Sequence, residues 1–226
     1  MLARIDHDDT LPIDQVVHGE CLSVMRSFPD NSVDSICADP PSSIHFMGKT
    51  WDNDRGGKYE WIAWLAAIMR EALRCVKPGG HAFIWALPRT SHMTAEALEQ
   101  AGWEIREKHY HLFGSGFPKS HDISKAIDRM KGVEREVIGA KRAGIGRHGR
   151  DDYDVFHGSA NESDKHISIT RPATPESEQW NGWGSATKPA AEEWILCRKP
   201  LSEKTLAANV LRWNCGGLNI DKSRVG

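Results

Sequence analysis

The chain has 226 residues and 39% apolar content, which is enough for one substantial hydrophobic core and an inserted segment. Its formal net charge of -2 gives no global sign of a nucleic-acid-binding protein, so any DNA contact must come from a local basic patch. The five cysteines are scattered and match no metal-ligand spacing, which favours a reduced, cytoplasmic protein without a metal. No apolar run has the length of a membrane span or a signal peptide.

The first part of the chain predicts short elements that end in a proline turn. After an extended segment at residues 15–18, we expect a helix at 21–27 and a strand at 33–38. The pair Pro40-Pro41 cannot continue the hydrogen-bonding ladder of that strand. The strand is therefore expected to deliver Asp39 to its carboxyl end.

The next part of the chain contains the strongest helix signal. From Lys58 to Val76 the apolar residues recur at helical spacing, and the phrase Lys77-Pro78-Gly79-Gly80 is expected to end the helix. A strand at 81–86, a helix at 94–101 and an extended segment at 103–113 follow. This alternation of strands and helices predicts an α/β fold with parallel crossovers.

The charge composition of the sequence changes in its second half. Residues 119–150 contain nine lysines and arginines against four acidic residues, and residues 151–179 are acidic and polar. We interpret residues 122–187 as an inserted segment, basic and then acidic, that is partly mobile. Regular structure resumes with a strand at 193–197 and a helix at 203–213.

Two short segments carry candidate chemistry at predicted strand ends. Ligands of open α/β sheets bind at the carboxyl ends of the strands, where Gly19-Glu20 and Asp39-Pro40-Pro41-Ser42 are both expected to lie as neighbours. The Asp39 carboxylate and the Pro40 carbonyl could together accept hydrogen bonds from an amine, and the prolines would fix both acceptors in advance.

Several phrases, in a shared order, resemble the DPPY-type DNA methyltransferases, which methylate adenine N6 or cytosine N4. These phrases are His18-Gly19-Glu20-Cys21-Leu22, Pro29 to Asp34 leading into Asp39-Pro40-Pro41, Phe46 to Lys49 with Trp51-Asp52, Leu73 to Gly80, Gly114 to Ser120, Gly182-Trp183-Gly184 with Lys188-Pro189, and Asn219-Ile220-Asp221. The resemblance spans nearly the whole chain. It implies a three-layer α/β sandwich with a mostly parallel, Rossmann-like sheet.

The resemblance also implies an enzyme that transfers a methyl group from S-adenosylmethionine to an exocyclic amine of a base flipped out of double-stranded DNA, as in restriction-modification in a bacterial or phage-infected cell. The implied catalytic residues are Asp39, Pro40, Pro41 and Ser42. The implied cofactor contacts are Gly19, Glu20, Cys21 and Asp39. The candidate DNA contacts are Lys49, Trp51, Lys119, Lys141, Arg142 and Arg147, and the neighbouring Lys131, Arg135 and Arg150 belong to the same basic stretch. Residues 122–187 thereby become a candidate target-recognition region.

Two features depart from the family pattern. Ser42 replaces the aromatic residue that stacks on the flipped base, an interaction typically worth about 1–3 kcal/mol, so Phe46, Trp51 or another ring must stand in. The family's glycine-rich cofactor loop, expected after Asn219-Ile220-Asp221, has no counterpart in this sequence. Three alternatives stay open. The first is a truncated or degenerate relative that only binds DNA or a partner, and the second is a site completed by a homodimer or a second chain. The third is a methyltransferase for another amine, such as RNA or a free nucleobase. For Glu20, capping a helix N-terminus is an equally open role.

Overall fold

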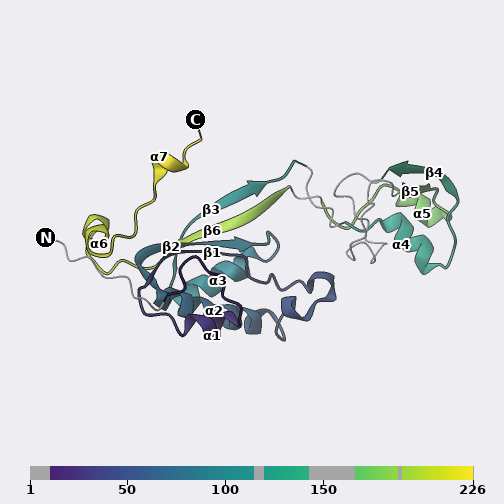
Figure 1. Cartoon of the computed structure of the whole chain (residues 1–226). Helices are drawn as coiled ribbons and strands as arrows, with labels where there is room; N and C mark the ends of the chain where they lie inside the picture. Colours follow the sequence, from purple (N-terminus) through teal and green to yellow (C-terminus); the bar gives the residue numbers. More distant parts are fainter. Residues whose placement is uncertain (1–10, 115–119, 143–165, 188–189, 226) are drawn as a thin grey trace. The chain divides into compact units, whose positions relative to one another are not determined.

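The chain forms two compact units in the computed structural model (Figure 1). The first unit comprises residues 1–111 with 192–226, and the second comprises residues 112–191. The residues that the structure describes are 11–114, 120–142, 166–187 and 190–225. Each unit is described by itself.

The first unit is built on a four-stranded sheet with the strand order β1-β2-β6-β3. Strand β1 (Val33–Ala38) runs parallel to β2 (Val76–Ala86), and β2 runs antiparallel to β6 (Ala191–Arg198). Strand β3 (Glu104–Leu112) lies beside β6 at the edge of the sheet. The predicted α/β class is therefore confirmed, and the described sheet is mixed, with both parallel and antiparallel neighbours.

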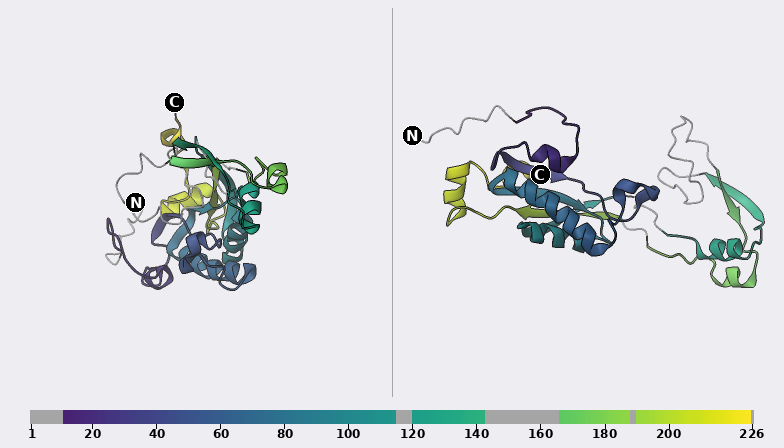
Figure 2. Two further views of the ribbon diagram at one scale, coloured as in Figure 1. Left: turned by 90° about the vertical axis from the view of Figure 1, so that its right-hand side faces the viewer. Right: turned by 90° about the horizontal axis from the view of Figure 1, so that it is seen from below.

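Two long helices cover one face of this sheet (Figures 1 and 2). Helix α2 (Lys58–Cys75) is the helix that the apolar spacing predicted, and α3 (Ser91–Ala101) follows β2. Their buried side chains form the hydrophobic core with the sheet residues Ile84 and Ile195, which face each other across β2 and β6. Burying each large apolar side chain contributes about 1.5–3 kcal/mol, so this core fixes the strands that carry the candidate site.

The junction between α2 and β2 differs from the sequence expectation. The phrase at residues 77–80 does not separate the two elements, because β2 begins at Val76, directly after the helix. Pairing of β2 with β1 shifts in register after Val76 and resumes at His81, so these residues form an irregularity inside the strand. Gly79 has φ +81°, and a Cβ at Gly80 would lie 2.7 Å from a β1 carbonyl oxygen. The glycines therefore permit a bend and a close approach within a buried strand.

The extended segment expected at residues 15–18 does not form a strand. Val16 is 99% exposed and Val17 is 47% exposed, so the segment buries no apolar face that a sheet could cover. The expectation that Gly19-Glu20 follows a strand is therefore wrong. Helix α1 (Cys21–Met25), which was predicted, begins directly after this segment.

Two short helices follow β6 in the first unit. Helix α6 (Leu206–Trp213) begins after the N-cap Thr205, and α7 (Ile220–Ser223) begins after the N-cap Asn219. The buried Asn209 of α6 donates from its side-chain amide to the Pro78 carbonyl at 2.8 Å, which joins α6 to β2. No helix within the described ranges is long and apolar enough to cross a membrane.

The described residues of the second unit form a small two-stranded sheet and two helices. Strand β4 (Val137–Arg142) pairs antiparallel with β5 (His166–Thr170), and the sequence reading had not predicted either strand. Its helices are α4 (Ile123–Met130) and α5 (Pro175–Gln179).

A buried carboxylate joins the parts of the second unit. Asp128, at 1% exposure, accepts hydrogen bonds from Arg135 Nη1 at 2.8 Å, Ala173 N at 3.1 Å and Thr174 Oγ1 at 3.0 Å. Burial alone would raise the pKa of Asp128, but the hydrogen bonds and the Arg135 charge hold it below the ordinary value. Arg135 was expected to belong to a phosphate-binding stretch. Its guanidinium is instead committed to this internal ion pair.

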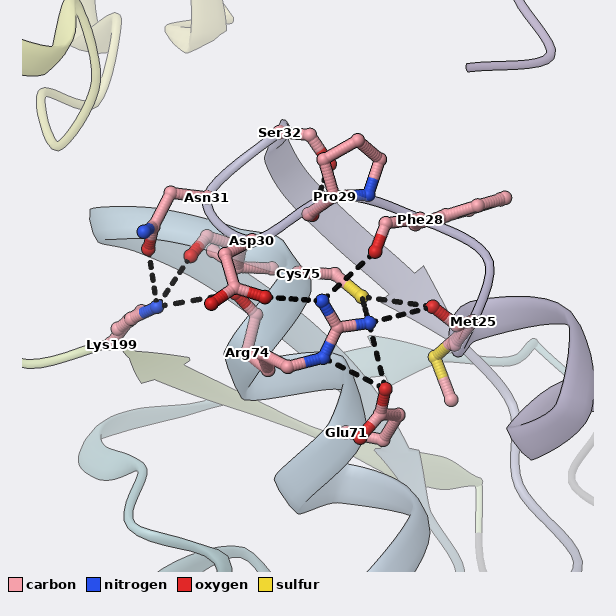
Figure 3. Close-up of polar contacts among 11 residues, drawn as sticks. Met25, Phe28, Pro29, Asp30, Asn31, Ser32, Glu71, Arg74, Cys75 and Lys199 are labelled. Carbon is pink, nitrogen blue, oxygen red and sulfur yellow. Dashed lines mark hydrogen bonds and ion pairs between the residues drawn. The ribbon is translucent and has the colours of Figure 1, made fainter. Parts of the chain in front are cut away.

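A polar cluster around Arg74 fastens the connection between α1 and β1 to the last turn of α2 (Figure 3). The Arg74 guanidinium donates to the carbonyls of Phe28 and Met25, each at 2.9 Å, and forms ion pairs with Asp30 and Glu71. Backbone carbonyls in such a loop need donors, and one guanidinium with five N–H groups supplies several at once. The Arg74 cluster therefore fixes the entry of the chain into β1.

We expect Arg74→Met to lower the free energy of unfolding by about 2 kcal/mol, because it removes charged donors from partly buried carbonyls while keeping the aliphatic stem. The matched control is Arg70→Met, one turn earlier on α2, where an exposed guanidinium donates to the Gln100 carbonyl. This control should change stability by less than about 0.5 kcal/mol. Urea unfolding followed by circular dichroism measures both, and equal effects would contradict the role of the cluster.

Candidate functional site

The structure places Asp39 directly after the last residue of β1, at the carboxyl end of the strand, as the sequence predicted. Pro40, Pro41 and Ser42 follow as a partly buried turn, whereas Asp39 itself is exposed. The proline rings fix φ at both positions and cannot donate to a neighbouring strand. The Asp39 carboxyl and the Pro40 carbonyl therefore lie on a short, stiff piece of backbone at the sheet edge.

A second carboxylate, Glu192, lies near Asp39. Glu192 is at the start of β6, and because β6 is antiparallel to β2, this start lies beside the carboxyl end of β2, where Ala86 pairs with Glu193. The indole Nε1 of Trp85 donates to Glu192 Oε2 at 2.9 Å. Partial desolvation of its carboxyl raises the pKa of Asp39 although the residue is exposed, and the negative charge of Glu192 raises it further. The site therefore favours a cation or hydrogen-bond donors beside Asp39.

The loop that begins at Ser42 wraps around the side chain of Asp52, which is completely buried. Asp52 Oδ1 accepts from the backbone N–H of Ser42 at 2.6 Å and of Ser43 at 2.9 Å. Asp52 Oδ2 accepts from the N–H of Ile44 at 3.3 Å and of Phe46 at 2.8 Å. One carboxylate thus binds four backbone donors from a stretch of five residues.

Further contacts hold the same loop. The hydroxyl of Thr90, a residue just before α3, donates to the Ser42 carbonyl at 3.1 Å. The His45 N–H donates to the Asp52 carbonyl at 2.9 Å. Ser43 and His45 have φ of 62° and 52°, in the left-handed region that is uncommon for residues other than glycine. The conformation of the loop is therefore set by its contacts rather than by local preference.

Two aromatic side chains are exposed on this loop. Phe46 begins the 3₁₀ turn η1 (Phe46–Gly48) and is 40% exposed, and Trp51 lies in η2 (Thr50–Asp52) and is 54% exposed. The exposed Lys49 separates the two turns. The Asp39-Pro40-Pro41-Ser42 turn therefore continues into a loop that presents two rings and a cation to solvent.

The predicted cofactor residues Gly19-Glu20-Cys21 lie at the start of α1. Glu20 is the N-cap, and its carboxylate accepts from Leu22 N at 3.2 Å and from Ser23 N and Oγ at 2.8 and 2.9 Å. These hydrogen bonds hold the pKa of Glu20 below its ordinary value. Within the described residues no hydrogen bond or ion pair joins Glu20 to Asp39. The capping role of Glu20, left open by the sequence, is the one that its contacts support.

The remaining predicted DNA contacts belong to the second unit. Lys119 and Arg147 lie outside the described residues. Lys141 and Arg142 end strand β4, but their side chains also lie outside the described part. Their assignment to DNA stays a prediction. Among the side chains that are described, no group of three or more His, Cys, Asp or Glu has an arrangement that could hold a metal ion.

Three residues of this site were not singled out from the sequence: Asp52, Thr90 and Glu192. Asp52 did stand in one of the family-like phrases, next to Trp51, and this was the available signal. Its complete burial could not be read locally, because the surrounding loop is polar and glycine-rich. Glu192 immediately precedes a predicted strand, and only the antiparallel pairing of β6 brings it to the carboxyl ends of β1 and β2.

Sequence comparison relates part of the chain to bacterial DNA methyltransferases. No family model matches the chain. The Type II methyltransferase M.BamHI of Bacillus amyloliquefaciens is 29% identical over 86 residues, which are 38% of this chain and 20% of that protein. The Type II methyltransferase M.BglII of Bacillus subtilis is 30% identical over 71 residues, 31% of this chain and 19% of that protein. These matches confirm the predicted resemblance to DNA methyltransferases.

The matched stretches thus span about one fifth of the length of these curated relatives. Among solved structures, the cytosine-N4-specific PvuII DNA methyltransferase is similar with a TM-score of 0.43 and 11% identity, over 84% of this chain and 50% of that one. Over the matched stretches the chain is similar to Type II DNA methyltransferases, and its α/β fold is described above.

The acidic environment of Asp39 gives a test that needs no substrate. Because Glu192 raises the pKa of Asp39 by charge repulsion, Glu192→Gln should lower that pKa, while the amide oxygen can still accept from Trp85. Titration of the Asp39 carboxyl carbon by NMR measures the shift. Glu96→Gln, on the exposed side of α3, is the control and should leave the midpoint unchanged. An unchanged or raised midpoint in Glu192→Gln would contradict the proximity of the two carboxylates.

Proposed function

We propose that this protein transfers a methyl group from S-adenosylmethionine to an exocyclic amine of a DNA base, adenine N6 or cytosine N4. The observation that carries the proposal is the pair of acceptors at the carboxyl end of β1, the Asp39 carboxylate and the Pro40 carbonyl. They lie next to the loop that begins at Ser42, whose N–H groups bind the Asp52 carboxylate. The sequence relation to Type II methyltransferases supports the same conclusion.

The acceptor pair suits the chemical difficulty of the reaction. An exocyclic amine is a weak nucleophile, because its nitrogen lone pair is delocalised into the ring of the base. Hydrogen bonds from the two amine hydrogens to Asp39 and to the Pro40 carbonyl would localise that lone pair and direct it. Since both acceptors lie on proline-restricted backbone, little freedom is lost when the base binds. An ionised Asp39 would accept more strongly than a protonated one, and its carboxylate could then take the proton that the nitrogen releases.

The charge around Asp39 fits the methyl donor that we propose. S-adenosylmethionine supplies an electrophilic methyl on a positively charged sulfonium, whose methyl–sulfur bond breaks as the amine nitrogen forms its new bond to carbon. Partial desolvation and Glu192 both raise the pKa of Asp39, so a nearby positive charge would stabilise the ionised carboxylates. Glu20 is exposed, but both of its oxygens already accept hydrogen bonds within the helix cap, so a contact with the donor's hydroxyl groups would have to share those oxygens.

The target base must leave the DNA stack to reach acceptors at a sheet edge, because a paired amine is already hydrogen-bonded inside the duplex. We propose that Trp51 or Phe46 takes the stacking role that Ser42 cannot fill. Both rings are exposed on the loop that Ser42 begins. Residues 122–187, with Lys141, Arg142 and Arg147, remain our candidate for target recognition, with Lys119 beside them and double-stranded DNA as the substrate.

The central test of this function is Asp39→Ala, which removes one of the two acceptors. We expect methyl transfer from labelled S-adenosylmethionine to DNA to fall by about 10²–10³-fold, the usual effect of deleting a preorganised polar group. Asp34→Ala, at the other end of the same strand, should retain activity. Equal thermal unfolding would show that the fold is intact. Normal transfer by Asp39→Ala would remove the assignment, and salt-dependent DNA binding without transfer by the unaltered protein would favour a binding-only role.

The stacking role predicts an effect on DNA binding. Trp51→Ala should weaken the binding of DNA that carries an unpaired target base by about 10-fold, since one base-aromatic stack contributes about 1–3 kcal/mol. Tyr59→Ala is the matched control, because Tyr59 is a 72% exposed ring on α2. Fluorescence anisotropy at a fixed salt concentration measures both. The same affinity in Trp51→Ala and Tyr59→Ala would exclude Trp51 as the stacking residue.

A further inference from the structure

The Asp52 carboxylate is completely buried and accepts hydrogen bonds from the backbone of its own loop. A buried carboxylate is costly unless its oxygens receive hydrogen bonds, and both oxygens of Asp52 receive two each from the loop. Bonds from backbone N–H groups to an ionised acceptor are stronger than those between neutral groups. The loop and Asp52 therefore stabilise each other: each would be unfavourable in this position without the other.

The backbone geometry of the loop shows what this interaction maintains. Ser43 and His45 both have positive φ, which is uncommon for residues with a Cβ. Such conformations persist where the surroundings impose them. Here the N–H groups of Ser43 and of residues on either side point at one carboxylate, in the manner of a backbone nest around an anion. Removing the negative charge would therefore release the loop to other conformations.

The held loop is directly connected to the acceptor pair. Both polar groups of the Ser42 backbone are bound, the N–H by Asp52 and the carbonyl by the Thr90 hydroxyl. Between Ser42 and the Pro40 carbonyl stands only Pro41, whose ring fixes φ. The contacts that fix the Ser42 backbone therefore also restrict the direction of the Pro40 carbonyl and of Asp39. The anchor comes from two separate elements, since Asp52 ends η2 and Thr90 precedes α3.

We propose that Asp52 and Thr90 are positioning residues that set the direction of the Asp39-Pro40-Pro41-Ser42 turn without touching the substrate. Asp52 acts through the loop N–H groups and Thr90 through the Ser42 carbonyl. As a statement about turnover, this inference rests on the proposed function. As a statement about the loop, it can be tested without any substrate.

The first arm of the experiment measures backbone hydrogen exchange in Asp52→Asn. An amide oxygen can replace one carboxylate oxygen, but the amide NH2 cannot accept from the loop. We expect exchange at Ser42, Ser43 and Phe46 to accelerate by at least about 10-fold, consistent with the loss of charge-assisted hydrogen bonds. Amides of the buried strand β2 should keep their rates. Asp54→Asn is the control: the Asp54 carboxylate is about half exposed, accepts from the Gly56 N–H and lies 3.7 Å from His45 Nε2, but among the described residues it accepts from none of the amides of Ser42, Ser43 and Phe46.

The second arm measures steady-state methyl transfer per folded protein. We expect Asp52→Asn to lower kcat by between about 10- and 100-fold, the range for a small misplacement of reacting groups, with the KM for DNA nearly unchanged. Thr90→Val keeps the shape of the side chain and removes its hydroxyl, and it should lower kcat by roughly 5-fold, as expected for one neutral hydrogen bond. A purely structural role would reduce the folded fraction and leave kcat per folded protein unchanged.

The outcomes separate the two claims. Unchanged exchange at Ser42 and Ser43 in Asp52→Asn would overturn the inference, and so would faster exchange with an unchanged kcat. If the unaltered protein transfers no methyl group, the proposed function fails, and the exchange arm still decides whether Asp52 holds the loop. If Asp52→Asn does not fold, Thr90→Val supplies both readouts, and an unchanged kcat and unchanged Ser42 exchange in that variant would overturn the inference.

Discussion

The candidate site depends on one interaction, the binding of four backbone N–H groups by the buried carboxylate of Asp52. This contact turns a polar loop, two of whose residues have positive φ, into a fixed support. The support continues through Ser42 and two prolines to Asp39. A site that works by positioning needs such rigidity, because most of its advantage is lost when the acceptors can move. The same loop also presents Trp51 and Phe46, so acceptors and rings share one anchor.

Other parts of the first unit position this site. Helices α2 and α3 pack on one face of the sheet and fix where β1 ends, and the Arg74 cluster fixes where it begins. The antiparallel strand β6 then brings Glu192 toward Asp39. The resulting concentration of negative charge is unfavourable in isolation and becomes favourable beside a cation or an amine. The electrostatics of the site and the chemistry proposed for it are therefore consistent.

Sequence reasoning located the elements whose cause is local. The apolar spacing of α2 and the Pro40-Pro41 stop after β1 both depend on neighbouring residues, and both are seen in the structure. It missed features that depend on contacts distant in the chain. The need for a glycine at position 80 is set by the approach of β1, the burial of Asp52 by a loop that folds back on it, and the position of Glu192 by strand pairing. For Glu20 the sequence allowed two roles, contact with the cofactor and capping of a helix, and the contacts in the structure support capping.

The most direct test of the proposed methyl transfer to an exocyclic amine of DNA is to identify the methylated product. The protein would be incubated with S-adenosylmethionine carrying an isotope-labelled methyl group and with unmethylated DNA, and the digested nucleosides would be analysed by mass spectrometry. We expect label in N6-methyladenine or N4-methylcytosine, because the acceptors at Asp39 and Pro40 would bind an exocyclic amine. Label in 5-methylcytosine, or no labelled nucleoside, would contradict it.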